Sequence, residues 1–256
     1  MRIGLVPMSA KPYHLGHHML VQLAALGDAS GAAIEGSPEN DEVFVLVSYT
    51  SRGTKPGIKK SGGKERPIPG ETPIFGEDMK YIWETLLIPN LEFPPNVTVL
   101  TPADGILPSP ITSVHKVLEA LHKASEAGDD SVTLPYVGIT VNPNDTVITV
   151  YSDIDDIDQN YPESLMNKLY PGSFGTSIMK FGIPRSSTVE ISGTKMRKML
   201  CDGDKEGFLP MLPPLPDRIA EEVFNTLSTS AIRLCPRSEW SSVSERLIRN
   251  LVRFML

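Results

Sequence analysis

Near its start the chain reads Ile3-Gly4-Leu5-Val6-Pro7-Met8-Ser9-Ala10-Lys11-Pro12-Tyr13-His14-Leu15-Gly16-His17, and this stretch decides the fold. Residues 3–7 form an apolar run that is typical of a strand buried in a sheet. Residues 15–26 repeat apolar side chains at helical spacing, and Gly27 is a suitable C-terminal stop. A strand that passes through a short turn into a helix is the first unit of a doubly wound α/β fold.

The same alternation of strand and helix continues along the chain. The expected strands are residues 42–48, 96–100, 146–151 and a short fifth strand from Ser187 to Ile191. The expected helices are residues 76–88, 110–127 and 193–201, and the expected loops are residues 28–41 and the Gly-, Pro-, Lys- and Arg-rich residues 50–73. This order predicts a Rossmann-like doubly wound parallel sheet with ligands at the carboxyl ends of its strands.

A proline-rich segment, Leu212-Pro213-Pro214-Leu215-Pro216, marks the expected domain boundary. We therefore divide the chain into an α/β domain over residues 1–210 and a short helical C-terminal extension over residues 211–256. Residues 217–256 are expected to form one or two helices.

Composition and charge limit the classes of function. The 256 residues are 40% hydrophobic and 21% charged, which is enough for a normal core. No apolar run approaches the roughly 18 residues of a membrane span, and the first apolar stretch is too short for a secretory signal. A disulfide between Cys201 and Cys235 is open but not expected in the reducing cytoplasm where we place the protein. The net charge of −7 argues against nucleic-acid binding. A homo-oligomer stays open.

The first motif combines two imidazoles with a helix start. His14 and His17 are three residues apart, so both can face one side of the first helical turn. Gly16 lets a ligand approach the backbone, and the free N–H groups and dipole of the helix favour an anion. Lys11 lies just before the motif, whereas His18 points about a quarter turn away and is left out. This pattern indicates a phosphate site; the alternative is a pair of polar residues capping a helix.

The second motif, Ile191-Ser192-Gly193-Thr194-Lys195-Met196-Arg197, passes into another helix. Ser192 is a good N-cap, and Thr194 adds a hydroxyl in the first turn. Gly193 opens the backbone to a ligand, and the planar guanidinium of Arg197 is suited to phosphate. The alternative is an ordinary amphipathic helix with exposed cations.

The two stretches together resemble the two signatures of the HxGH nucleotidylyltransferase superfamily. The usual first signature is aromatic-x-Pro-x-His-x-Gly-His, whereas here Lys11 precedes Pro12 and Tyr13 follows it. The resemblance covers the motifs and residues 1–210. The chain looks especially similar to the cytidylyltransferase-like proteins of tailed phages, while the Ile-Ser-Gly-Thr form of the second signature is closer to the adenylyltransferases.

This resemblance implies a role for each motif residue. His14 and His17 would stabilise the pentacoordinate centre and the triphosphate, and Lys11 would neutralise charge. The β- and γ-phosphates would be held by Ser192, Thr194 and Arg197. The remaining expected nucleotide-binding residues are Pro7, Met8, Gly16, Ile191 and Gly193. Mg²⁺ is the implied cofactor, bridging the phosphates mostly through water, so no protein metal site is expected.

The implied reaction is nucleotidyl transfer from a nucleoside triphosphate to a small phosphorylated acceptor. The favoured pair is ATP and nicotinamide mononucleotide, which would place the protein in NAD biosynthesis. Alternatives are a cytidylyltransferase acting on a phosphorylated alcohol, a phosphopantetheine adenylyltransferase and a non-catalytic nucleotide sensor. An aminoacyl-tRNA synthetase fragment would need a Lys-Met-Ser-Lys-Ser loop, which Lys195-Met196-Arg197-Lys198 only mimics. An assembly role for residues 217–256 is also open. A phage-encoded protein would act in the host cytoplasm.

Three further groups have two interpretations each. The basic residues within 52–66 are either a clamp over phosphates or a solvated surface loop. Tyr81 and Trp83 either stack on a substrate ring or pack in the core. An acidic cluster is either a helix start or a contact for Mg²⁺ or a second substrate, and its members are Asp153, Asp155, Asp156 and Asp158.

Overall fold

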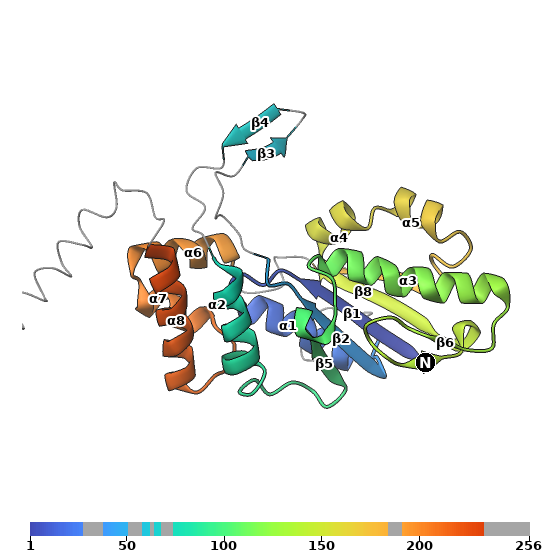
Figure 1. The fold of residues 1–256 in the computed structure, drawn as a ribbon, viewed down its shortest axis with the longest axis horizontal. Helices are drawn as coiled ribbons and strands as arrows, with labels where there is room; N and C mark the ends of the chain where they lie inside the picture. Colours follow the sequence, from blue (N-terminus) through green and yellow to red (C-terminus); the bar gives the residue numbers. More distant parts are fainter. Residues whose placement is uncertain (28–37, 51–57, 62–63, 68–73, 184–190, 233–256) are drawn as a thin grey trace, which may run out of the picture. The chain divides into compact units, whose positions relative to one another are not determined.

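The computed structural model describes residues 1–27, 38–50, 58–61, 64–67, 74–183 and 191–232 (Figure 1). The chain groups into two compact units. Unit 1 contains Met1–Ala10, Leu15–Tyr49 and Glu92–Glu190. Unit 2 contains Lys11–His14, Thr50–Leu91 and Ile191–Leu256. The boundary expected between residues 210 and 211 stays a prediction.

Unit 1 is built on a five-stranded parallel sheet with the order β5-β2-β1-β8-β9. Its strands are β1 (Arg2–Met8), β2 (Glu42–Val47), β5 (Val97–Leu100), β8 (Val147–Asp153) and β9 (Ile178–Ile183). In chain order this sheet reads 3-2-1-4-5, as in a Rossmann-like fold, and the direction of winding reverses between β1 and β8. The predicted α/β class and parallel sheet are confirmed.

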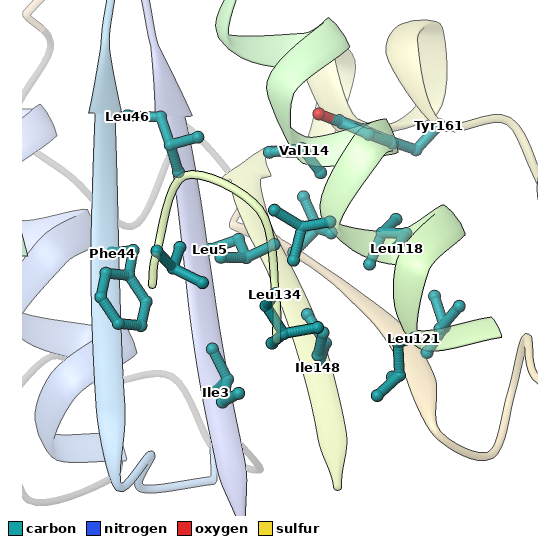
Figure 2. Close-up of a cluster of buried hydrophobic side chains, with 14 of the residues drawn as sticks. Ile3, Leu5, Phe44, Leu46, Val114, Leu118, Leu121, Leu134, Ile148 and Tyr161 are labelled. Atoms are coloured by element: carbon teal, nitrogen blue, oxygen red, sulfur yellow. The ribbon is translucent and has the colours of Figure 1, made fainter. Parts of the chain in front are cut away.

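One face of the sheet packs against α3 (Pro110–Ala127). Figure 2 shows Leu5 of β1 and Ile148 of β8 in one cluster with Val114 and Leu118 of the helix. These side chains are fully buried because β1 and β8 are central strands, so the alternate residues of each strand reach the α3 face. The helix is fixed at its start by Ser109, whose hydroxyl accepts from the backbone N–H of Thr112 at 3.3 Å.

The other face is covered by α1 (Leu15–Leu26). Buried Asn40 joins this helix to the sheet, because its Nδ2 donates to the carbonyl of Ala24 at 2.6 Å and to the hydroxyl of Tyr151 at 2.8 Å. A Cβ on Gly4 would stand 3.2 Å from the same Nδ2, so β1 has a glycine where the asparagine crosses it. The remaining elements of unit 1 are η3 (Pro102–Asp104), β6 (Val132–Thr133), β7 (Thr140–Val141), η4 (Pro143–Asp145), α4 (Ile154–Asn160) and α5 (Glu163–Leu169).

Unit 2 is mainly helical. Its elements are the strands β3 (Ile58–Ser61) and β4 (Lys64–Pro67), α2 (Gly76–Tyr81), the π-helix η2 (Ile82–Leu87), α6 (Gly193–Asp202), α7 (Lys205–Phe208), η6 (Leu209–Met211) and α8 (Asp217–Ile232). The helix α8 packs against α6, α2 and η2, and Phe224 of α8 meets Phe208 edge to face at 5.3 Å. The predicted helix beyond residue 217 is confirmed by α8, while residues 233–256 lie outside the described part.

Three expectations need correction. The fifth strand of the described sheet is β9, which was not expected; of the strand expected at residues 187–191, residues 187–190 lie outside the described part, and Ile191 belongs to no strand. Lys180 interrupts the apolar pattern of β9, and this edge strand accommodates it by pairing it with Asp158 at 2.7 Å. Part of the basic region expected as a loop is the antiparallel pair β3–β4. Cys201 is disulfide-bonded, which was not expected, and Cys235 lies outside the described residues.

Among the residues that the structure describes, no helix combines the length and apolarity needed to cross a membrane.

Replacing Asn40 with Ala should destabilise the protein by about 1–3 kcal/mol, because the buried carbonyl at the end of α1 loses its donor. Urea unfolding of wild type and variant measures the difference. The control is Asn167→Ala, since the exposed Asn167 amide also bonds a helix carbonyl, that of Glu163 at 3.0 Å. Equal losses in the two variants would contradict a special role for Asn40.

Candidate functional site

The loop between β1 and α1 is closely packed. The backbone of Ala10 has a φ of 37°, in the left-handed region, and the Lys11–Pro12 peptide bond is cis. All four residues of Lys11–His14 are buried. Lys11 and His14, two of the residues expected to bind phosphate, therefore lie in a buried loop of unit 2.

Trp83 of η2 supports this loop from one side. Its ring meets that of Tyr13 edge to face, with 4.8 Å between the ring centroids, and both side chains are almost wholly buried. Such an aromatic pair contributes about 0.5–1.5 kcal/mol beyond the burial of its area. The interpretation of Trp83 as a core residue is confirmed. Tyr81, in contrast, is exposed and donates a hydrogen bond to Glu222 of α8.

The second motif begins α6 as predicted. The hydroxyl of Ser192 accepts from the backbone N–H of Lys195 at 3.1 Å, so Ser192 is the N-cap. Ser192 and Thr194 are both exposed, and the first turn of the helix carries no acidic side chain. The end of α6 is fixed by Gly203, which has a left-handed φ of 67°. The start of this helix is therefore suited to an anion.

Arg197 joins the two motifs. Its Nη1 donates to the backbone carbonyl of Lys11 at 2.8 Å, across 186 positions of sequence, and its Nη2 donates to the hydroxyl of Thr194 at 3.0 Å. Only 4% of the residue is exposed. A Cβ on Gly193 would stand 3.1 Å from Nη1 and 3.3 Å from the Lys11 carbonyl oxygen. Gly193 thus lets the loop approach the helix, a packing reason that the sequence did not reveal.

Burial sets the protonation state of His14. The residue is 8% exposed, and desolvation lowers the pKa of its imidazole to about 4. At neutral pH His14 is therefore a neutral hydrogen-bonding group. Lys11, with 7% exposed, brings a cationic side chain to the same loop.

The other predicted residues lie on the flanking elements. In unit 1, Pro7 and Met8 end β1, while Gly16 and His17 are half-buried in the first turn of α1. In unit 2, Ile191 is half-buried directly before the cap of α6.

His18, which was left out of the site, is buried in unit 1. Its ring lies 5.8 Å from that of Phe93, and its Nε2 is 3.3 Å from the amide nitrogen of Gln22. Burial lowers the pKa of His18 as well.

The acidic cluster follows the interpretation as a helix start. Asp153 is the N-cap of α4, and its carboxylate accepts from the backbone N–H groups of Asp155 and Asp156 at 3.0 and 3.2 Å. The fourth member, Asp158, pairs with Lys180. Within the described residues, no group of three or more His, Cys, Asp or Glu side chains could hold a metal ion.

No protein-family model matches this sequence, and the comparison with curated proteins finds no match.

The buried neutral state of His14 predicts a pH-dependent stability. Between about pH 6.5 and pH 4 the unfolded chain binds a proton at this imidazole and the folded chain does not. The free energy of unfolding therefore decreases as the pH is lowered through this range. Above pH 6.5 the imidazole is neutral in both states, so the stability that depends on neutral His14 is fully present. Wild type should lose about 2 kcal/mol more than His14→Asn between pH 7 and pH 5 in denaturant titrations. An equal loss in both proteins would show that His14 titrates normally.

Proposed function

We propose that this chain is a nucleotidyltransferase, which moves a nucleotidyl group from a nucleoside triphosphate to a small phosphorylated acceptor and releases pyrophosphate. The observation that carries the proposal is the hydrogen bond from Arg197 to the Lys11 carbonyl. Within unit 2 it connects the loop Lys11–His14, which begins the first motif, to the second motif at the start of α6. Two unrelated sequence matches, 186 positions apart, would not be expected to lie in contact in the folded chain.

The triphosphate would lie at the start of α6. Free N–H groups at this helix end and the hydroxyls of Ser192 and Thr194 would bind its β- and γ-phosphate oxygens. Lys11 would neutralise charge from the facing loop, and neutral His14 would donate a hydrogen bond. A chain with a net charge of −7 can bind such an anion because the positive groups are local.

The reaction needs no covalent intermediate on the protein. A phosphate oxygen of the acceptor forms a bond to the α-phosphorus while the bond from that phosphorus to the bridging oxygen breaks. The leaving pyrophosphate takes the electron pair of the broken bond. His14 and His17 would donate hydrogen bonds to the oxygens on which charge grows, and the remaining contribution of the protein is alignment.

Mg²⁺ would be bound at this site together with the triphosphate. The phosphates and water would supply most of its coordination, as is usual for Mg²⁺ bound with a nucleotide. When bound, the ion neutralises charge on the phosphate oxygens.

ATP and nicotinamide mononucleotide are the favoured substrates. The only ground for this choice is that the second motif resembles the form found in adenylyltransferases. A phosphorylated alcohol with CTP, or phosphopantetheine with ATP, would use the same cradle. The test is pyrophosphate release with Mg²⁺, in which ATP and CTP are crossed with a panel of phosphorylated acceptors. Release that requires one triphosphate and one acceptor is expected. Triphosphate binding without release for any pair would contradict the transferase proposal and favour a nucleotide sensor.

His17→Ala should lower turnover by about 100-fold or more, because a contact made to the growing charge is lost. Far-ultraviolet circular dichroism should remain that of the wild type. The control is Gln22→Ala in the same helix, which should retain wild-type turnover. A His17→Ala enzyme as fast as the wild type would remove His17 from the site.

A further inference from the structure

We propose that Arg197 is a positioning residue, which acts on the substrate through the loop Lys11–His14 rather than by binding phosphate itself. The inference rests on the proposed function for its effect on turnover. Its structural part, a loop held in place by one guanidinium, can be tested without any substrate.

The hydrogen bonds of Arg197 carry the inference. Both terminal nitrogens of the guanidinium donate to protein oxygens, one on the Lys11 carbonyl and one on the Thr194 hydroxyl. A buried guanidinium is costly unless its donors have acceptors, so these bonds fix the side chain in its direction. That direction is toward the loop backbone.

The loop is held on a second side by aromatic packing. Tyr13 lies against Trp83 of η2, two residues after the carbonyl that Arg197 binds. Between these two contacts the backbone is fixed on either side of Pro12, and it carries Lys11 and His14 with it. Arg197 therefore sets where the lysine ammonium and the neutral imidazole lie.

The contact also leaves little room for a side chain on the helix side. Gly193 has no side chain at the point where the Lys11 carbonyl and Nη1 approach α6. The guanidinium, the loop carbonyl and the first residue of α6 thus form one packed joint. We name these three groups the loop joint.

Loss of the loop joint should affect alignment more than affinity. The hydroxyls and N–H groups at the start of α6 remain available to the triphosphate without Arg197. A displacement of about 1 Å in a positioning group can reduce turnover by a factor of order 100. We therefore expect a fall in kcat of about 10- to 100-fold, with a change in the KM for triphosphate of less than about threefold.

The experiment compares Arg197→Gln with Lys198→Gln in the full chain. Both variants remove one positive charge from α6, but Lys198 is exposed and the described contacts of the loop joint do not include it. Arg197→Lys is the conservative variant, because it keeps the charge and a donor that can reach one acceptor. It should recover part of the lost kcat.

A second readout needs no nucleotide. Trp83 and Trp240 are the two tryptophans of the chain, so a Trp240→Phe background leaves Trp83 as the only indole emitter. Trp83 is fully buried. Release of Tyr13 should increase quenching of Trp83 by acrylamide at least twofold in Arg197→Gln and leave it unchanged in Lys198→Gln.

The outcomes separate the two proposals. Increased quenching together with a selective loss of kcat supports the positioning role. Wild-type quenching together with a tenfold rise in the KM for triphosphate would overturn it and make Arg197 a phosphate ligand. If Arg197→Gln shows wild-type quenching and the wild-type protein transfers no nucleotidyl group with any substrate pair, both the positioning role and the proposed function are overturned. Increased quenching without transfer would leave the loop joint standing while the proposed function fails. If Arg197→Gln does not fold, Arg197→Lys carries the same comparison.

Discussion

Strand β1 is paired on both sides and covered on both faces, and the position of the candidate site depends on this constraint. Its backbone groups bond to β2 and β8, and its side chains pack under α1 and α3. Such a strand can hold only apolar or very small residues. Polar side chains that could bind a ligand can therefore follow only after β1 ends at Met8. The next loop contains Lys11 and His14.

A loop that leaves a central strand has backbone carbonyls and N–H groups that need partners. In this chain the Lys11 carbonyl finds its partner in Arg197, on a helix that comes after the last strand of the sheet. An arginine meets this need better than a lysine would, because its planar fork can reach a second acceptor, the Thr194 hydroxyl, at the same time. The buried Arg197 thus gives the Lys11 carbonyl a hydrogen-bond donor and binds the Thr194 side chain in the first turn of α6. It also holds together two segments that are distant in sequence.

The sequence predicted the features that depend on local pattern. The strand and helix around the first motif, the Ser192 cap and the helix α3 were all predicted from apolar spacing and capping residues, which act within a few positions. Edge strand β9 was missed because Lys180 and Gly182 break its apolar run, and only the pairing of Lys180 with Asp158 explains the lysine. The direction of Arg197 could not be predicted either. Exposed and buried arginines look alike in sequence, and the carbonyl that binds this one lies 186 positions away.

The protonation state of His14 connects burial to the proposed chemistry. To the extent that an imidazolium beside a triphosphate attracts the bound substrate and the transition state with similar strength, it lowers KM without raising kcat. Burial keeps the pKa of His14 near 4, so the group remains neutral and directional. A neutral donor gains most when charge grows on the oxygen that it faces, which happens in the transition state. In the proposed reaction, Lys11 would supply the charge for binding, and His14 would add the part of the interaction that distinguishes the transition state from the bound substrate.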